Sequence, residues 1–355
     1  MTNRLKLAVT GIGNNISALV QGVGYYRQMI DQGQSTDELP GIRNYMIGDI
    51  RVTDIDFVAA FDVQKEKIGL PISSAIFEPP NNYPNLGLGN IDPGAVVQSG
   101  LRFEEGKVIG HDEVVSALKE SGAEVLLYSL PTGLLWAAEE YAKCALDAGV
   151  GFVNCTPEVV ARNIEIMNEF DRRNLALIGD DLASHMGTSM IHRALLNLLI
   201  DRGLDLENTY QLNLGGNEDF RNLHMHGESK AVSKKNALAQ SGLDADRVHV
   251  IPSAGFVPHL QDRKVAFLNV IGRGWANTPI SIDLKLEVQD SSNAAGVIID
   301  LIRIAAASQR CGKSGFNAAA SSFLKSPPGG HETLGKEIEA RAFESLSSAS
   351  LKKTG

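Results

Sequence analysis

A short stretch near the N-terminus constrains the fold of this chain more than any other. Residues 5–9 form a largely apolar run of strand length, Gly11 and Gly13 follow it, and a helical pattern begins by Ser17. A strand, a glycine turn and a helix start in this order present backbone N–H groups and the positive end of a helix dipole to an anion. Because Ile16 and Ser17 occupy the place of the third glycine in the G-x-G-x-x-G pattern, two interpretations stay open. The turn either binds a phosphate or simply connects a strand to a helix.

A second apolar run, residues 55–62, predicts another buried strand, and it ends in Asp62. A carboxylate at this position can accept both hydroxyls of an adenosine ribose and repels a 2′-phosphate, which favours NAD over NADP. The usual interval from the glycines to the acid is about 20 residues, so we expect an insertion between about residues 26 and 54. The alternative is that Asp62 is a turn acid that caps the next helix.

Composition limits the class of protein. A chain of 355 residues predicts about two domains. The net charge of −9 argues against a nucleic-acid binder, and no apolar run has the length of a membrane span. The three cysteines Cys144, Cys155 and Cys311 lack metal-type spacing and cannot all pair, as is typical of a reducing compartment. We therefore expect a soluble cytoplasmic protein without a nucleic-acid or membrane partner.

Residues 63–110 are rich in Pro, Gly and Asn, which predicts loops with little regular structure. Such a long segment would be a lid over a bound cofactor or a surface embellishment. After it, helical and strand patterns alternate. The predicted elements are a helix over 112–121, a strand over 124–130, a helix over 134–148, and strands over 151–155 and 175–178. This rhythm predicts an α/β fold with a parallel sheet.

Ligands of parallel sheets lie beyond the carboxyl ends of the strands. The candidates at these ends are Ser129, Leu130, Asn154 and Thr156. Two adjacent acids, Asp180 and Asp181, follow the next strand and could hold a hydroxylated ring, a cation or the cofactor's ribose. They could equally cap the helix that follows, and we expect this of one of the two.

The pattern then changes to a strong helix over 184–201 and to longer strands. Residues 210–214, 264–271 and 280–288 are predicted strands. Apolar and polar side chains alternate in 210–214 and most cleanly in 280–288, which is typical of a sheet with one face in a core. A striped helix over 293–308 is expected to return to the first domain. The tail from residue 332 is expected to be a helix with a frayed end.

Five ordered segments resemble the myo-inositol-1-phosphate synthase family, most closely its shorter bacterial and archaeal members. They are residues 11–15, 213–217, 229–234, 262–266 and 324–328. The resemblance implies a Rossmann-type doubly wound parallel sheet with a second α+β domain, tightly bound NAD and a homotetramer. It also implies the domain division: an NAD-binding domain over 1–183, a catalytic and tetramerisation domain over 184–292, and a C-terminal segment over 293–355 that returns to the first domain.

The family's reaction explains which residue types are needed. D-Glucose 6-phosphate is oxidised at C5, enolised, closed by an intramolecular aldol step and reduced to 1D-myo-inositol 3-phosphate, so NAD is regenerated. Negative charge passes between oxygens at each stage, and lysines suit such a site because they stabilise oxyanions and shuttle protons. A single lysine is by default a solvated surface charge, but four here fall in four family motifs.

By motif match, Lys230 and Lys234 resemble the phosphate and oxyanion lysines, and Lys264 resembles the lysine near C5. Lys325 resembles a further active-site lysine. The resemblance makes Asp181 and Asp290 the carboxylates that orient these lysines or contact NAD and the sugar. The remaining implied contacts are Gly216 and Asn217 to the phosphate, and Gly11, Gly13, Asn14, Asn15, Asp62, Ser129, Leu130, Asn154, Thr156, Asp180 and Asp181 to the cofactor.

Other readings remain. A relative could close a ketose phosphate such as fructose 6-phosphate to a five-membered cyclitol phosphate, and residues 218–221 and 224–227 are where ring recognition would change. The fold could also serve an NAD-binding regulatory protein, which the four lysines argue against, or a plain dehydrogenase with net NADH output. A divalent or monovalent cation is possible in this family. His224 and His226 alone, without a third ligand, are a weak metal signal.

Overall fold

The computed structural model describes residues 4–89, 91–226, 248–330 and 336–351. Its larger sheet has six strands in the order β10-β9-β8-β1-β4-β5, and every pair in it is parallel. The strands are β1 (Leu5–Thr10), β4 (Ile55–Asp62), β5 (Val97–Ser99), β8 (Val125–Tyr128), β9 (Gly151–Asn154) and β10 (Leu177–Ile178). If these six strands are numbered by their order in the chain, the sheet reads 6-5-4-1-2-3 from one edge to the other. This is the strand order of the doubly wound dinucleotide-binding fold. The predicted α/β fold class is confirmed.

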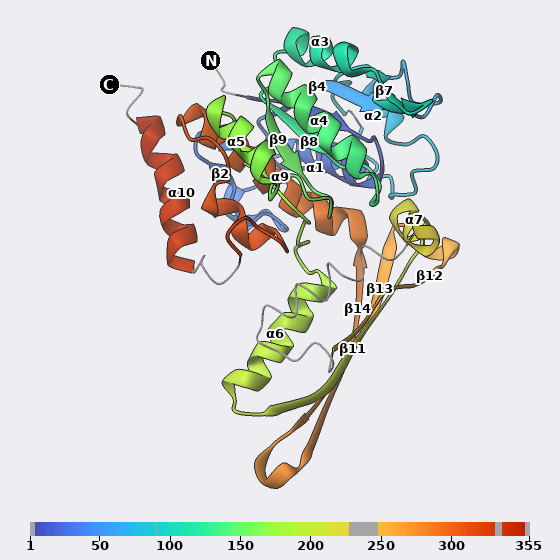
Figure 1. Cartoon of the computed structure of the whole chain (residues 1–355), viewed down its shortest axis with the longest axis vertical. Helices are drawn as coiled ribbons and strands as arrows, with labels where there is room; N and C mark the ends of the chain where they lie inside the picture. Colours follow the sequence, from blue (N-terminus) through green and yellow to red (C-terminus); the bar gives the residue numbers. More distant parts are fainter. Residues whose placement is uncertain (1–3, 90, 227–247, 331–335, 352–355) are drawn as a thin grey trace.

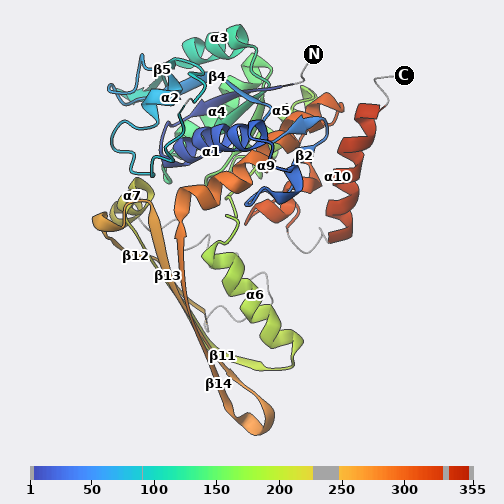
Figure 2. The ribbon, with the colours of Figure 1, turned by 180° about the vertical axis from the view of Figure 1, so that it is seen from behind.

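Helices cover both faces of this sheet (Figures 1 and 2). One face carries α1 (Asn14–Asp31) and α9 (Asp290–Arg310). The other carries α3 (His111–Ser121), α4 (Leu135–Ala148) and α5 (Ile164–Arg172). The sequence analysis did not identify α5. Because strand side chains alternate between faces, each central strand supplies both cores.

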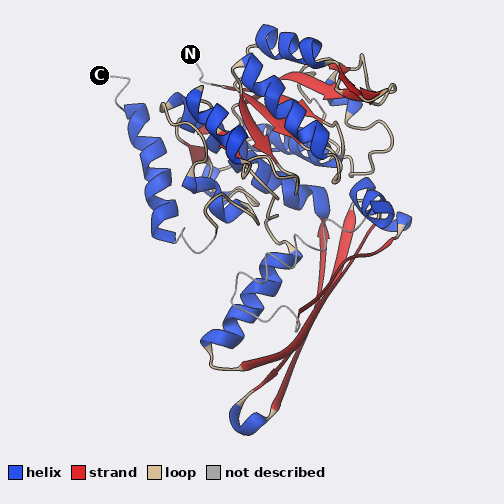
Figure 3. Cartoon of the chain, viewed as in Figure 1, coloured by secondary structure: helices blue, strands red, loops and turns tan. Residues whose placement is uncertain are grey.

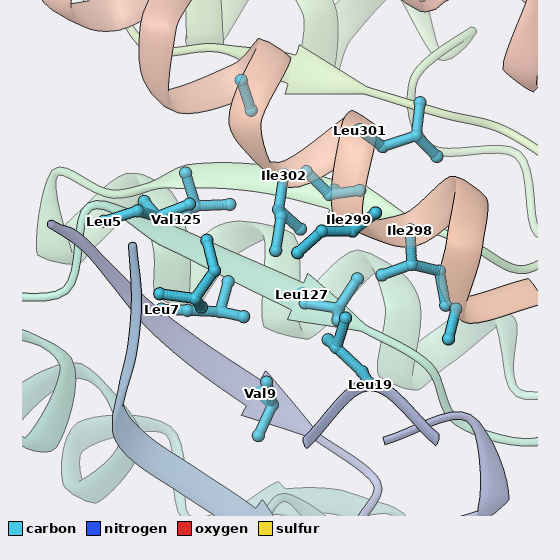
Figure 4. Packing of buried hydrophobic residues seen from close by; sticks show 14 of the residues in the cluster. Leu5, Leu7, Val9, Leu19, Val125, Leu127, Ile298, Ile299, Leu301 and Ile302 are labelled. Atoms are coloured by element: carbon cyan, nitrogen blue, oxygen red, sulfur yellow. The ribbon is translucent and has the colours of Figure 1, made fainter. Parts of the chain in front are cut away.

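Figure 4 shows how α9 packs against the middle of the sheet. Leu7 of β1 and Leu127 of β8 belong to the same buried cluster as Ile298 and Ile302 of the helix. Burying an aliphatic side chain of this size contributes about 1.5–3 kcal/mol, and α9 is buried along most of its length. The predicted return of the C-terminal part to the first sheet is therefore present, and it supplies much of that sheet's core.

Two insertions decorate the sheet. The interval between the glycine turn and Asp62 holds the long α1, the short helix η1 (Thr36–Glu38) and a hairpin of β2 (Met46–Ile47) and β3 (Ile50–Arg51). The segment 63–110 is mostly loop, as predicted, with α2 (Ile72–Ala75) and a hairpin of β6 (Arg102–Glu104) and β7 (Lys107–Ile109). The prediction missed β5, which pairs with β4 and extends the sheet.

A second, four-stranded sheet extends away from the larger one (Figures 1 and 3). Its order is β12 (Val248–Phe256), β11 (Asp205–Gly215), β13 (Arg263–Arg273) and β14 (Pro279–Gln289). The helix α6 (Thr188–Asp201) packs on one face, where Leu199 meets Val270 and Ile282. This helix begins four residues later than predicted, because residues 184–187 form a turn before it.

Short elements complete the described chain. They are α7 (Glu218–His226), η3 (Pro258–Leu260), η4 (Trp275–Asn277), η5 (Ala318–Phe323) and α10 (Lys336–Leu351). The helix predicted in the C-terminal tail corresponds to α10. No helix in the described part of the chain is both long and apolar enough to span a bilayer.

Candidate functional site

A cavity of about 340 Å³ lies at the carboxyl ends of the parallel strands, between the two sheets. Its wall contains most of the residues predicted from the sequence. They are Gly11, Gly13, Asn14, Asn15, Asp62, Ser129, Leu130, Thr156, Asp181, Asn217, Lys264, Asp290 and Lys325. The glycine turn near the N-terminus and residues from the last quarter of the chain thus line the same cavity.

The glycine turn is shaped for close backbone approach. Gly11 has a φ of +73°, and a Cβ added there would lie 2.8 Å from a methyl of Leu130 and 2.9 Å from the carbonyl oxygen of Ser129. Gly13 is the N-cap of α1 and has no side chain to satisfy the first N–H groups of the helix. The helix start and its dipole are therefore available to an anion in the cavity.

Asp62 holds the turn from the neighbouring strand. One carboxylate oxygen accepts the N–H of Ile12 at 2.7 Å, and the other accepts those of Val63 and Gln64 at 2.7 and 2.9 Å. The interpretation of Asp62 as a helix cap is wrong, because α2 begins at Ile72 with Pro71 as its N-cap. Asp62 instead shapes the turn after β4, links it to the glycine turn and lines the cavity.

Lys264 lies on the face of the second sheet that carries α6, and it forms an ion pair at the cavity. Its Nζ is 3.0 Å from Oδ1 of Asp290, and the amide of Asn217 donates to the other oxygen at 3.3 Å. The ammonium also lies 5.7 Å from the ring centroid of Phe220, within the range of a cation–π contact. Asp290 is the first residue of α9, where the helix dipole stabilises a carboxylate.

Lys325 forms the second ion pair. Its Nζ donates to Asp181 at 2.7 Å, and its backbone N–H donates to the carbonyl of the same residue at 2.7 Å. The N–H of Asp181 is bound in turn by the carbonyl of Thr156 at 2.9 Å. The segment after η5 is thus fastened across the ends of β9 and β10.

Two predicted cofactor residues lie behind the cavity wall. Asp180 is fully buried and accepts from the amide of Asn154 at 2.8 Å and from the N–H of Ala161 at 2.9 Å. Burial raises the pKa of its carboxyl, and these donors and Arg162 oppose the rise.

The expectation that either Asp180 or Asp181 caps the following helix is wrong, because α6 has Gly187 as its N-cap.

Gly216 is also set back from the cavity. A Cβ there would lie 2.5 Å from the backbone nitrogen of Gln261, so two backbone segments approach closely at this point. Its carbonyl accepts from the side chain of Asn82 at 2.9 Å. Lys230 and Lys234 lie outside the described residues, as do the side chains of His224 and His226.

A polar link between the two sheets escaped the sequence analysis. The amide of Asn14 donates to Asn82 at 2.6 Å and to Asp262 at 2.9 Å, and Ser291 also donates to Asp262 through its hydroxyl at 2.6 Å. Burial, with a contribution from Asp290, raises the pKa of Asp262 to about 6, although the hydrogen bonds oppose the rise. Only its place in the 262–266 motif could have pointed to Asp262, and only the composition of residues 63–110, which allowed a lid over a cofactor, pointed to the loop around Asn82.

No cluster of three or more potential metal-binding side chains occurs among the described residues.

The fold and the cavity define a Rossmann-like α/β enzyme whose site is lined by residues of both sheets. Residues 187–291 match the family described as myo-inositol-1-phosphate synthase. The inositol-3-phosphate synthase of Mycolicibacterium smegmatis is 39% identical over 345 residues, which cover 91% of this chain and 93% of the relative. The chain belongs to the inositol-3-phosphate synthase family and is an enzyme of that type.

Solved structures share this fold. The crystal structure of Ari2 is 56% identical, covers 98% of this chain and 100% of its own, and superposes with a TM-score of 0.90. A myo-inositol-1-phosphate synthase-related protein from Thermotoga maritima has a TM-score of 0.74 with coverage of 97% on both sides. Its 20% identity shows a shared fold alone.

Proposed function

We propose that this protein catalyses the NAD-dependent, redox-neutral cyclisation of a hexose 6-phosphate, with D-glucose 6-phosphate as substrate and 1D-myo-inositol 3-phosphate as product. One observation carries the proposal. The glycine turn and Asp62 line the same cavity as two lysine–carboxylate pairs, Lys264 with Asp290 and Lys325 with Asp181. Groups suited to cofactor recognition and to proton transfer therefore line one cavity.

The described residues fit a dinucleotide. The start of α1 has no side-chain cap and suits a pyrophosphate. Gly11 has no side chain, so the backbone of the turn is open to the ligand. Asp62 suits a ribose without a 2′-phosphate. When bound, NAD would accept a hydride from the sugar and later return it. The site residues bind and orient the reactants and hold the protons.

The two lysines have complementary tasks. We assign to Lys264 the proton of the sugar hydroxyl that is oxidised. The lysine would pass one ammonium proton to the adjacent Asp290 and, as the neutral amine, accept the hydroxyl proton. We assign to Lys325 the stabilisation of negative charge on a neighbouring sugar oxygen. Both ammonium groups are mostly buried, with side chains 19% and 17% exposed, so their charges act with little screening by water.

A regulatory NAD-binding protein would not need these pairs. Burying a lysine and an aspartate together costs desolvation energy that packing of apolar residues would avoid. The cavity contains two such pairs from four different parts of the chain. The enzyme assignment explains them, whereas binding of NAD alone does not.

A second substrate fits the same reaction scheme. The same oxidation, enolisation and aldol chemistry would close fructose 6-phosphate to a five-membered cyclitol phosphate. This is our alternative to glucose 6-phosphate.

Incubation of the purified protein with each sugar phosphate and catalytic NAD tests both substrates. NMR of the product identifies a six-membered or a five-membered cyclitol phosphate, and absorbance at the NADH band follows the cofactor. We expect a cyclitol phosphate without net NADH. Stoichiometric NADH would instead show a dehydrogenase, and no turnover with either sugar would refute the proposal. Repeating the assay with a chelator and with added Mg²⁺ or K⁺ determines whether a cation is required.

We also propose a homotetramer that functions in the cytoplasm. On the face of the second sheet opposite α6, Tyr210 and Phe267 are 43% and 37% exposed and lie near the half-buried Leu212. Such an apolar strip is typical of an interface between subunits. Light scattering should give four times the chain mass, and Phe267→Asp should give a smaller species. A monomeric parent protein at micromolar concentration would contradict the tetramer.

A further inference from the structure

Lys67 is a buried lysine at the cavity that the proposed reaction does not use. It lies in the segment after β4 and is only 2% exposed. Its Nζ donates to the carbonyl oxygen of Ile12 at 2.7 Å and to the side-chain oxygen of Asn81 at 2.9 Å. Desolvation by burial lowers the pKa of Lys67, whereas the negative charges of Asp62 and Glu78 raise it.

The peptide groups of Ile12 are held on both sides. Its N–H donates to Asp62, and its carbonyl accepts from Lys67 and, at 2.9 Å, from the amide of Asn81. Ile12 stands between the two glycines of the turn, so these contacts fix the direction in which the turn presents its backbone. Asn81 supplies one neutral donor, and Lys67 supplies a charged one.

An ammonium has three N–H donors, and within the described residues two of those of Lys67 are used. A buried ammonium is costly unless its charge is compensated. Asn81 alone would satisfy the Ile12 carbonyl, so bracing of the turn does not by itself require a cation. The positive charge lies on the side of the cavity where Asp62 stands, and it would attract an anionic ligand there.

We infer that Lys67 is a positioning and specificity residue for the phosphate-bearing adenylate half of the dinucleotide. It orients the glycine turn through the Ile12 carbonyl, and its charge partly offsets the repulsion that Asp62 exerts on phosphate. This inference rests on the proposed function, because it requires that the cavity bind NAD. A purely structural lysine would affect NAD and NADP alike, whereas a charge near the phosphates matters more for the more anionic NADP.

Titration calorimetry of the full chain with NAD and with NADP separates these cases. Lys67→Met should weaken NAD binding by about 10- to 100-fold, because the glycine turn loses one of its two donors at the Ile12 carbonyl and the site loses a positive charge. It should weaken NADP binding by more, so the preference for NAD increases. Lys65→Met, at an exposed lysine two residues earlier, is the matched control and should change neither affinity. Asn81→Ala removes a neutral donor and should weaken both by a similar factor.

The outcomes are distinguishable. A parent protein that binds no NAD would refute the proposed function itself. Binding by the parent with unchanged affinity in Lys67→Met, or with equal losses for NAD and NADP, would overturn the role of Lys67 alone. If Lys67→Met does not fold, Lys67→Gln gives the same test, because it keeps a donor for the Ile12 carbonyl and removes the charge.

Discussion

The Nζ of Lys325 lies 2.7 Å from a carboxylate oxygen of Asp181, although the two residues are 144 positions apart. The backbone of the same two residues is also joined, by a hydrogen bond of 2.7 Å. The segment that follows η5 is thereby held across the end of β10. A lysine from the last part of the chain thus becomes part of the cavity formed by the first sheet.

Replacing Lys325 tests its assigned role in charge stabilisation. Lys325→Ala should lower turnover by about 10²- to 10⁴-fold, because one positioned cation beside a developing oxyanion contributes that much. NAD affinity should fall less than turnover, since the described hydrogen bonds of Lys325 join it to Asp181 rather than to the glycine turn. Steady-state kinetics and NAD titration measure both. Turnover within threefold of the parent would exclude Lys325 from the chemistry.

Lys264→Ala should abolish cyclitol formation while NAD still binds. The variant loses the group to which we assign the sugar proton and leaves Asp290 without its cation. Lys285→Ala is the matched control, because Lys285 is on the adjacent strand with its side chain 58% exposed. Product formation is measured by NMR. A Lys264→Ala protein that keeps most of the parent's turnover would show that the assignment is wrong.

Asp62→Ala should weaken NAD binding and relax discrimination against NADP. The ribose would lose an acceptor and a 2′-phosphate would lose a repelling charge. Three backbone N–H groups also lose their acceptor, so the variant should be less stable to urea. Titration with both cofactors and a urea curve measure these effects. Equal NAD affinity in the variant and the parent would remove Asp62 from the site.

The raised pKa of Asp262 predicts a pH dependence of stability. The folded pKa of about 6 is above the ordinary value of 3.8, so this carboxyl binds its proton more tightly in the folded state. Its stabilising contribution is complete below about pH 4 and is lost as the pH rises through 6, a change of up to about 3 kcal/mol.

Asp262→Asn removes this titration. Urea unfolding between pH 4 and 7 should therefore show the free energy of unfolding of the variant rising relative to that of the parent as the pH increases. A constant difference across this range would contradict the prediction, whatever the sign of that difference. The comparison between the two proteins cancels the other carboxylates, which titrate in both.

Arg303→Met should strongly destabilise the fold. The guanidinium is fully buried in α9, pairs with Asp300, and donates to the carbonyls of Asn44 at 2.7 Å and Tyr45 at 2.9 Å. Its loss leaves the buried carboxylate of Asp300 with the amide of Asn44 but without its cation, which costs about 3–5 kcal/mol. Urea denaturation measures the loss. The double variant Arg303→Met/Asp300→Leu should recover part of it, and no recovery would show that the backbone contacts dominate.

The local elements and their chemistry follow from the amino-acid sequence alone. The apolar run of β1, the glycines after it and the strand that ends in Asp62 were predictable, because strand periodicity and turn conformation are properties of neighbouring residues. Three strands of the second sheet followed for the same reason, whereas β12 was not predicted. Lys264 and Lys325 were found through short motifs, which carry residue type and spacing without partners.

Which residues share the cavity depends on the folding of distant segments against one another. Two adjacent acids look alike in the sequence, yet Asp181 faces Lys325, whereas Asp180 is buried against Asn154. Lys67 is one lysine in a loop until the fold brings it against Ile12, 55 residues away. These roles depend on contacts between distant segments, and such contacts are set by the packing of whole elements around the two sheets, which no local pattern encodes.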